Sequence, residues 1–506
     1  MTDSIINRIV STAPAPGHHL RIARLDGGPT IELTDLYAQA GRVAAGLRRL
    51  GVRPGDRIGI LAANCLQWVL LDLAALWCGV VTAGFEPGKF PADPALLDRY
   101  ELTLLFTDRP EAAQLFAAEP RLRPIEEVTA LAGDLDAAVT EPVSYPPEAV
   151  TTLKFTSGST GEPKGLAASV GSIDSSLRAV QEMFTHGPGD DIFVFLPLSL
   201  LQQRYWIYSA LAYGHDVTVS TYEAAFVMMR RVRPTVVMGV PGFFETARRH
   251  IESQSGRPVP EAARRLFGDR IRYLWTGSAP ASAAMLRFFT DNGLPIFEGY
   301  GLNETCIVSK NHPGASRAGS VGKVLPGKRV LIDADGVVSV ASDHPVNVRY
   351  EYAAPGESER VFGTDGVVRT GDLGYLDEDG YLFIRGRADD VIVLDNGKKV
   401  IVRPIEEQFR TSPAIAQCVV YCPTQTHLVA VVSPAGEPDV AAVTAHLART
   451  NEVLAPDERI RRVVVVGEPF SIDNGLLTSQ YKPRRAEIFN RYQAEIMASG
   501  EGVYAY

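Results

Sequence analysis

The chain has 506 residues, of which 46% are hydrophobic and 22% are charged, a balance that is typical of globular proteins and allows a large buried core. A chain of this length usually divides into more than one domain. The net charge of −9, with no basic stripe along the sequence, argues against nucleic acid as the main partner, because phosphate recognition needs clustered cations.

The beginning of the chain and the cysteines indicate a compartment. Residues 1–20, "MTDSIINRIVSTAPAPGHHL", are polar and lack the apolar core of a signal peptide. The five cysteines are scattered, and "CVVYC" (418–422) has the wrong spacing for a Cys-x-x-Cys metal or redox site. We expect buried thiols in a reducing cytosol, and therefore a cytoplasmic protein.

The most apolar run, "WVLLDLAALWCGVVTAGF" (68–85), is long enough to suggest a membrane span. It carries Asp72 early and glycines late, which favours a buried helix that leads into a strand. We therefore expect no integral membrane association.

Short β-rich runs alternate with helical stretches along the first part of the chain. Strands are predicted in "DRIGIL" (56–61) and "VVTAGF" (80–85), on either side of the apolar helix. Further β-rich runs follow at residues 191–198, 216–220, 234–240, 271–277 and 295–301. This alternation predicts an α/β fold with stacked, mostly parallel sheets whose faces are covered by helices.

After Gly319 the alternation of strands and helices gives way to hairpin patterns. "GSVGKVLPGKRVLIDADGVVSV" (319–340) and "GYLFIRGR" (380–387) read as hairpins with Asp-Gly turns, which predicts a β-rich subdomain. The last segment then mixes β-rich runs with helices. The turn-rich stretch near Gly386 is the natural boundary, so we expect a large N-terminal domain, 1–386, and a small α+β C-terminal domain, 387–506.

The stretch "FTSGSTGEPKG" (155–165) follows a predicted strand, "AVTTLKF" (149–155), and concentrates hydroxyls and glycines around one lysine. It is not a Walker A sequence, because Lys164 is preceded by Pro163 and followed by Gly165. Backbone N–H groups and hydroxyls could still surround phosphate oxygens, with the lysine supplying charge. On composition alone a flexible surface turn is the commoner structure.

Four further segments accompany this loop, in the order "WTGSAP" (275–280), "FEGYGLNET" (297–305), "RTGDLGYLDEDGYLFIRGRADD" (369–390) and "LLTSQYKPRR" (476–485). The ordered set resembles the adenylate-forming superfamily, which includes acyl-CoA synthetases, adenylation domains and luciferases. The resemblance covers nearly the whole chain. "GSVGKVLPGKRV" and "NGKKVIVRPIEE" look most like the long-chain fatty acyl-CoA synthetase branch.

The resemblance implies a two-step ligase reaction that uses ATP and Mg²⁺. A carboxylate attacks the α-phosphorus of ATP to give an acyl-adenylate and pyrophosphate, and a second nucleophile, often a thiol such as that of CoA, displaces AMP. Because both reactants are anions, the chemistry needs cations and aimed hydrogen-bond donors more than it needs a general base.

The resemblance also assigns the nucleotide site. Tyr300 would stack on adenine, Asp372 would accept hydrogen bonds from the ribose hydroxyls, and Glu304 with Thr156 would hold Mg²⁺. Taken singly, each of these residues is more often a core tyrosine or a solvated loop acid. The full nucleotide and phosphate set is Thr156, Ser157, Gly158, Ser159, Thr160, Gly161, Lys164, Gly277, Ser278, Ala279, Pro280, Glu298, Gly299, Tyr300, Gly301, Asn303, Asp372, Ile384 and Arg387.

Lys482 is the expected catalytic residue, together with Lys164, Asn303 and Glu304. In the family a lysine at this place bridges the carboxylate and the α-phosphate. Because it belongs to the small domain, rotation of that mobile domain about a hinge at Asp389 would withdraw it before the second step. The alternative is an exposed basic tail, since "KPRR" is a common surface sequence.

Two departures from the family leave the acid and the acceptor open. Asn303 stands where the family has Thr, and Leu200 and Gln203 stand where long-chain relatives have His and Glu. The polar and aromatic residues 202–206 could line the acid pocket or form one face of a helix. Candidates for a pocket that suits a fatty or aryl acid are Leu200, Gln203, Trp206, Val240, Pro241, Phe243 and Trp275.

Three functions therefore remain open at this point. The first is an acyl-CoA synthetase. The second is a ligase of the same fold with another acceptor or anion, such as an amine, a carrier-protein thiol, or nitrite activated for diazotisation. The third is a catalytically silent nucleotide-binding protein, which is disfavoured because the chain keeps all of Lys164, Glu304, Asp372, Arg387 and Lys482.

Overall fold

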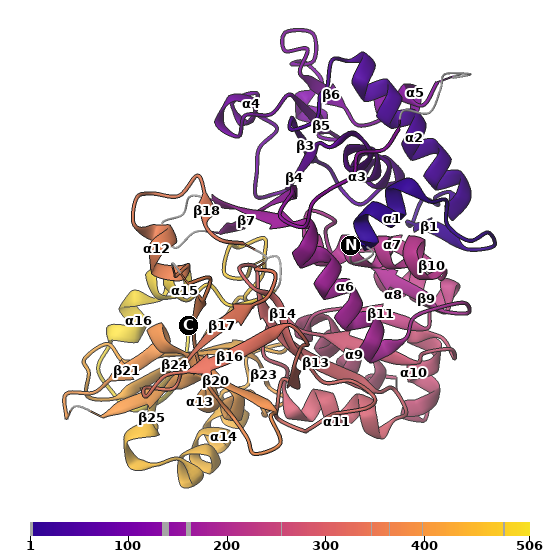
Figure 1. The fold of residues 1–506 in the computed structure, drawn as a ribbon. Coiled ribbons are helices and arrows are strands. Elements are labelled where there is room, and N and C mark those ends of the chain that lie inside the picture. The colour runs from indigo at the N-terminus through magenta and orange to yellow at the C-terminus, as the bar shows by residue number, and fades with distance from the viewer. Residues whose placement is uncertain are drawn as a thin grey trace.

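The computed structural model describes residues 4–133, 141–157, 163–254, 256–345, 347–363, 365–396, 398–478 and 481–506. Two mostly parallel sheets form the body of the molecule, a third, antiparallel sheet lies beside them, and the chain ends in a smaller α+β unit (Figure 1). The predicted α/β fold, with its β-rich portion, is confirmed.

The first sheet contains β7 and β8, the strands on either side of the part of the stretch 155–165 that the structure does not describe. Its central and outer strands are parallel, whereas β8 and β18 are antiparallel additions next to β7. In spatial order it consists of β18 (Tyr350–Glu351), β8 (Pro163–Ser169), β7 (Val150–Ser157), β4 (Val81–Phe85), β3 (Arg57–Leu61), β5 (Leu104–Thr107) and β6 (Leu122–Pro124).

The second sheet carries the motifs of residues 191–310. It is parallel from β13 to β1, and its two ends are antiparallel. In spatial order it consists of β15 (Lys323–Val324), β14 (Cys306–Lys310), β13 (Ile296–Leu302), β12 (Tyr273–Thr276), β11 (Val236–Met238), β9 (Asp191–Val194), β10 (Asp216–Ser220), β1 (His19–Ala23) and β2 (Thr30–Glu32).

One large core lies between these two sheets, because the helices that separate them bury apolar side chains on both sides. Figure 1 shows α6 running through this region. The separating helices are α1 (Ile5–Ser11), α2 (Leu33–Arg49), α3 (Leu66–Cys78), α6 (Val170–Phe184) and α7 (Leu201–Tyr213), with α5 (Glu127–Leu131) against α2 and α3.

The outer faces are covered by further helices. The far face of the second sheet packs against α8 (Ala225–Val232), α9 (Pro241–Glu252), α10 (Val259–Phe267) and α11 (Ala283–Asp291). The far face of the first sheet is covered by α4 (Ala95–Arg99) and the short turn η1 (Pro110–Ala112). Both sheets are thus buried on their two faces, as parallel sheets usually are.

The third sheet is the predicted pair of hairpins, with its turns at Asp335-Gly336 and Asp379-Gly380. It is antiparallel throughout, in the order β16 (Lys328–Ile332), β17 (Val337–Ser342), β19 (Val368–Leu376) and β20 (Leu382–Arg387), and α12 (Glu357–Val361) contacts β19.

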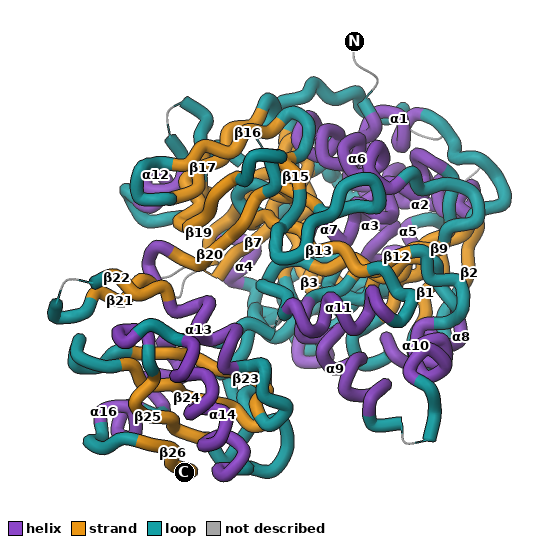
Figure 2. The backbone as a smooth tube through the Cα atoms, turned by 90° about the horizontal axis from the view of Figure 1, so that it is seen from below, coloured by secondary structure: helices purple, strands orange, loops and turns teal. Residues whose placement is uncertain are grey.

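The C-terminal unit follows the turn η2 (Ala388–Asp390). Figure 2 shows it as a separate body beside β20, with α13 and α14 along its sheet. It contains the ribbon of β21 (Val391–Val393) and β22 (Lys399–Ile401), then α13 (Val402–Phe409), β23 (Ile415–Tyr421), β24 (Leu428–Pro434), α14 (Val440–Val453), η3 (Pro456–Glu458), β25 (Ile460–Val465), α15 (Arg485–Arg491), α16 (Gln493–Met497) and β26 (Gly502–Ala505). Its sheet, β23-β24-β25-β26, has its own core.

The apolar run 68–85 is confirmed as a buried helix and strand, α3 and β4. Within the described ranges, no helix combines the length and hydropathy that a membrane crossing requires. Asp72, in the middle of α3, is buried because it pairs with Arg204 of α7 at 2.8 Å.

This ion pair is almost fully enclosed, since Arg204 is 0% and Asp72 3% exposed. We expect Asp72→Asn to leave a buried, uncompensated guanidinium and to lower the free energy of unfolding of the large domain by about 3 kcal/mol. Urea denaturation followed by tryptophan fluorescence measures this, because all four tryptophans lie between residues 68 and 275.

The matched control is Arg329→Met, which breaks the exposed pair with Asp343 and should change stability by less than about 0.5 kcal/mol. An Asp72→Asn variant as stable as that control would contradict a structural role for the buried pair.

Candidate active site

The candidate site lies where β9, β11, β12 and β13 end, at the carboxyl edge of the second sheet, which is where open α/β sheets bind ligands. A cavity lies at this edge, with about 530 Å³ of space when its open mouth is counted. Its lining residues are Leu196, Gln202, Gln203, Trp206, Met238, Gly239, Val240, Trp275, Gly277, Ser278, Gly299, Tyr300, Gly301 and Ile307.

Four of the expected nucleotide residues come together at the mouth. The Tyr300 hydroxyl donates to Asp372 Oδ2 at 2.5 Å, and the Arg387 guanidinium donates to Asp372 Oδ1 at 3.1 Å. Ile384 packs in the same small apolar cluster as Tyr300. Residues that are distant in the sequence, on β13, β19 and β20, thus present an aromatic face, a carboxylate and a cation to one point.

The backbone beside Tyr300 is held very close to its neighbours. A Cβ atom added at Gly301 would lie 2.0 Å from the carbonyl oxygen of Cys306, so only glycine allows β13 to approach β14 here. Gly277 lies against Gly299, where an added Cβ would be 3.3 Å from the Gly299 carbonyl oxygen. Gly277, Ser278 and Gly299 line the cavity, and the half-buried Ala279 and Pro280 follow.

Glu298 lies on β13 directly before Gly299, where the strand begins to line the cavity. Its carboxylate accepts a hydrogen bond from the Ala281 N–H at 2.9 Å, and it is buried near Lys310. The Lys310 ammonium donates to the carbonyls of Thr276 and Phe297 and lies 3.5 Å from the centroid of the Trp275 ring. This buried lysine was not predicted from the sequence, and it ties β12, β13 and β14 together at the site.

Three further side chains missed by the sequence analysis hold the turn that carries Asn303 and Glu304. Lys154 donates to the carbonyl of Asn303, Asn347 donates to the carbonyls of Asn303 and Glu304, and Lys328 donates to the carbonyls on either side of Cys306. A lysine in the middle of the apolar strand "TTLKF" is the one sequence signal that could have indicated this arrangement.

Burial changes the pKa values of the side chains around this turn. Burial lowers the pKa of Lys154, and it lowers the pKa of Lys328 to about 8. Burial alone would raise the pKa of the Cys306 thiol, but the two ammonium groups outweigh it and lower that pKa. The turn that presents Glu304 is thus held by two buried lysines and by the neutral amide of Asn347.

The Glu304 carboxylate accepts a hydrogen bond from the Tyr350 hydroxyl at 2.7 Å. Lys164, on β8, lies with its ammonium 5.0 Å from the Tyr350 ring centroid and 2.9 Å from the Glu357 carboxylate. Thr156 pairs with Lys164 in the β7–β8 register, so both ends of the loop face this corner. Gly158, Ser159, Thr160 and Gly161 lie outside the described residues, as does the side chain of Ser157.

These residues fit Mg²⁺. Among the described residues no three His, Cys, Asp or Glu side chains gather into a metal cluster. Mg²⁺ does not need one, because it usually takes one or two carboxylates and completes its shell with substrate phosphates and water. Glu304 supplies such a carboxylate, and Tyr350 links it to the corner where Lys164 lies.

Lys482 of the C-terminal unit lies near the residues expected to bind the nucleotide. Burial lowers the pKa of Lys482, whereas the carboxylates of Asp372 and Glu304 raise it, so the ammonium lies within electrostatic range of both. The preceding Tyr481 stacks on Tyr222 with ring centroids 5.1 Å apart, and its Cβ would be 2.9 Å from a Cβ added at Gly242. Through these contacts of Tyr481, the segment that carries Lys482 packs against the large domain.

Four of the seven residues predicted to line an acid pocket lie around the cavity. Gln203, Trp206, Val240 and Trp275 line the cavity. The described lining residues do not include Leu200, Pro241 and Phe243. Phe243 instead turns into the core, with its ring centroid 4.3 Å from that of Phe195, while Leu200 packs at the edge of that core and Pro241 begins α9 there.

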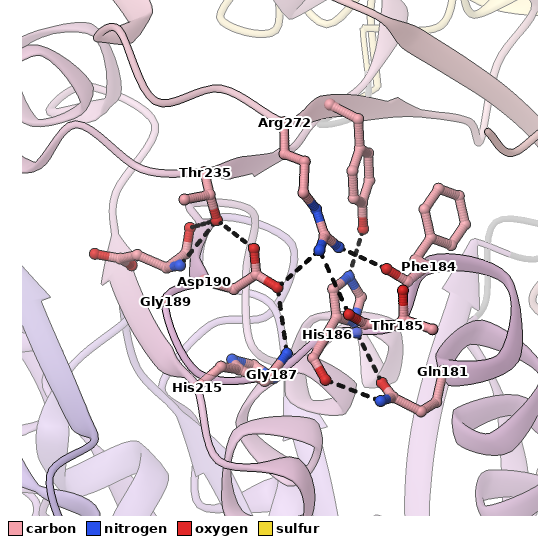
Figure 3. Close-up of polar contacts among 12 residues, drawn as sticks. Gln181, Phe184, Thr185, His186, Gly187, Gly189, Asp190, His215, Thr235 and Arg272 are labelled. Carbon is pink, nitrogen blue, oxygen red and sulfur yellow. Dashed lines mark hydrogen bonds and ion pairs between the residues drawn. The ribbon is translucent and has the colours of Figure 1, made fainter.

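A second polar cluster lies at the opposite, amino edge of the second sheet (Figure 3). There Asp190 accepts hydrogen bonds from Thr235 and Gly187 and pairs with Arg272 at 3.2 Å, and His186 contacts the Tyr273 hydroxyl at 2.6 Å. Burial lowers the pKa of His186 to about 2, so the imidazole is neutral. This cluster joins the end of α6 to the sheet and does not face the nucleotide residues.

The comparisons with known proteins agree with this geometry. Residues 13–344 match the family model described as AMP-binding enzyme, and residues 389–503 match that of the AMP-binding enzyme C-terminal domain. The long-chain-fatty-acid–CoA ligase FadD15 of Mycobacterium bovis is 28% identical over 91% of this chain and 90% of the relative. A feruloyl-CoA synthase of an Amycolatopsis species is 27% identical over 78% of this chain and 81% of the relative.

Among solved structures, ATP-bound MatB from Rhodopseudomonas palustris shares the fold, with a TM-score of 0.81 at 23% identity over 98% of this chain and 100% of that structure. The chain therefore belongs to the family of AMP-binding enzymes, the adenylate-forming family that its motifs resemble. Within that family it belongs to the class of AMP-forming acid–thiol ligases.

Glu298 gives a test of the site's electrostatics. Burial raises the pKa of its carboxyl to about 7, from an unfolded value of 4.5, so the folded chain retains a proton that the unfolded chain has lost. Stability therefore falls as pH rises from about 4.5 to about 7. Glu298→Gln does not titrate, so we expect its stability relative to the parent to increase across that window, by up to about 3 kcal/mol.

The measurement is the difference in urea midpoint between variant and parent at about pH 5 and about pH 8. The variant keeps an oxygen for the Ala281 N–H, so loss of that bond does not confuse the result. A difference that is the same at both pH values would show that Glu298 titrates normally.

Proposed function

We propose that this protein activates a carboxylic acid with ATP to form an acyl-adenylate and pyrophosphate, and then transfers the acyl group to a thiol such as that of CoA. The observation that carries the proposal is that Lys482 is buried within electrostatic range of Asp372 and Glu304, and that Asp372 is hydrogen-bonded to Tyr300. A cation delivered by the C-terminal unit thus meets the nucleotide residues.

Each residue has a role that follows from its charge. Tyr300 would offer its ring to adenine, and Asp372, fixed by Arg387, would accept from the ribose hydroxyls. Lys164 would exchange its bond to Glu357 for the β- and γ-phosphates, and Asn303 would donate to the α-phosphate. Glu304, with Thr156, would hold Mg²⁺, which lowers the repulsion between the phosphates and the acid.

Lys482 would stabilise the first transition state. Its ammonium would lie between the attacking carboxylate and the α-phosphate, where negative charge is concentrated, and no proton transfer is required of it. We place the boundary between the large domain, 1–386, and the lid, 387–506, near Gly386. Asp389, exposed in the turn η2, would be the hinge about which the lid turns before thiol attack.

The relatives support two classes of acid, since one is named a long-chain-fatty-acid–CoA ligase and another a feruloyl-CoA synthase. The alternative acceptors are an amine, a carrier-protein thiol, or nitrite chemistry, and the observation in their favour is the apolar Leu200 where long-chain relatives carry His. We propose a cytoplasmic location, because ATP, CoA and reduced thiols occur together there.

We expect Lys482→Ala to abolish pyrophosphate release while ATP binding, measured by calorimetry, stays within about threefold of the parent. The reason is that Lys482 acts on charge that develops only in the transition state. Lys398→Ala is the matched control, since it removes a lysine of the same unit that is 53% exposed and pairs with Asp457. Normal pyrophosphate release by Lys482→Ala would refute the assignment.

We expect Asp372→Ala to raise KM for ATP more than KM for the acid, by about tenfold or more, because a charge-assisted bidentate contact with the ribose is lost. Steady-state kinetics with each substrate varied in turn measures both constants. The ribose role fails if the KM for ATP is unchanged.

A further inference from the structure

The inner end of the cavity is closed by aromatic rings. Trp206 of α7 and Trp275 of β12 both line it, with ring centroids 5.3 Å apart and planes at 70°. Behind them, Phe184 lies 5.3 Å from Trp275 and His186 lies 5.9 Å from Trp206. On the side of Trp206 and Trp275, the cavity (the slot) is therefore backed by packed rings.

This wall is held in place from both sides. Lys310 lies 3.5 Å from the centroid of Trp275, and its ammonium is bonded to two carbonyls. His186 contacts the Tyr273 hydroxyl, and it makes two hydrogen bonds with Gln181, which Figure 3 shows. Interiors packed in this way do not open for a single added group, so a long alkyl chain would have to displace several rings.

The same end of the slot presents two polar groups that lack partners. Trp206 is 3% and Gln203 is 7% exposed, and both line the cavity. Trp206 Nε1 and Gln203 Oε1 make no hydrogen bond with any described residue. Because a buried polar group without a partner costs about 1–3 kcal/mol, two of them side by side on one helix at a ligand cavity indicate a polar ligand group.

The chemistry of these groups defines the ligand. The indole N–H only donates, so it needs an acceptor, and the amide oxygen accepts, so it needs a donor. A hydroxyl provides both. Leu196, Met238, Val240 and Ile307 add apolar surface to the lining, and the tryptophan rings favour a flat partner.

We propose that the acid activated by this protein is a compact aryl acid that bears a hydroxyl or similar hydrogen-bonding substituent, and that Trp206 and Gln203 read that substituent. The inference rests on the proposed function, and it assigns the acid class which that function leaves open. The carboxylate would face Gly277 and Gly299, and the substituent would face the closed end of the slot.

The test compares matched acids. Pyrophosphate release is measured with 3- and 4-hydroxybenzoate, 3- and 4-methylbenzoate, octanoate and palmitate, in the presence of ATP and Mg²⁺. We expect kcat/KM for at least one hydroxy acid to exceed that of its methyl isostere by about tenfold or more, because the methyl group leaves both buried polar atoms unpaired. Palmitate should be the poorest substrate.

Two variants test whether Trp206 and Gln203 cause the preference for the hydroxy acid over its methyl isostere. In Trp206→Phe/Gln203→Leu, which keeps a ring and an apolar stem, the hydroxy-to-methyl ratio should fall to about one. The control is Trp68→Phe. The Trp68 indole is also buried and its N–H also lacks a partner among the described residues, but its ring contacts Arg204 and does not line the cavity. This control should keep the parent's ratio, and the Tm and ATP affinity of each variant are measured alongside.

The outcomes separate the two proposals. Activation of palmitate or octanoate above every aryl acid, or a ratio that survives in the double variant, overturns the inference and leaves the ligase function standing. Pyrophosphate release with none of the acids, while ATP binds, overturns both, and nitrite and amines then become the anions and acceptors to test.

Discussion

The repulsion between two anions governs this structure. ATP and an acid must meet in one cleft, and each brings negative charge, so the protein has to collect cations from distant parts of the chain. Lys164 comes from the first sheet, Arg387 from the third, and Lys482 from the C-terminal unit. None of the sheets could supply all of them, which explains why the site lies where the units meet.

A second set of cations acts on the backbone. Lys154, Lys310 and Lys328 are buried, and their ammonium groups donate to carbonyls of β12, β13 and the turn that follows. Burying an ammonium is costly unless it is well bonded, and here the bonds are made to the strands that present Tyr300 and Glu304. The same hydrogen bonds that stabilise β12, β13 and the following turn therefore also hold Tyr300 and Glu304 in position.

The acid side of the site follows a different rule. Apolar and aromatic side chains line it together with Gln202, Gln203 and Ser278, and further rings pack behind Trp206 and Trp275. The relatives at 26–28% identity include enzymes named for fatty and for aryl acids, so overall likeness does not select between them. The selection depends on a few side chains at one end of α7, where a cavity wall and two unpartnered polar atoms coincide.

The sequence by itself determined the α/β fold and the order of the motifs, because strands, Asp-Gly turns and glycine-rich loops are encoded by neighbouring residues. The tertiary structure decided which side chains line the acid slot, and that Phe243 turns away from it. It also decided the buried pairs, since Lys154 and Asn303 are 149 residues apart and Arg204 and Asp72 are 132 apart. Contacts over such separations depend on how the sheets and helices pack, and no local pattern records them.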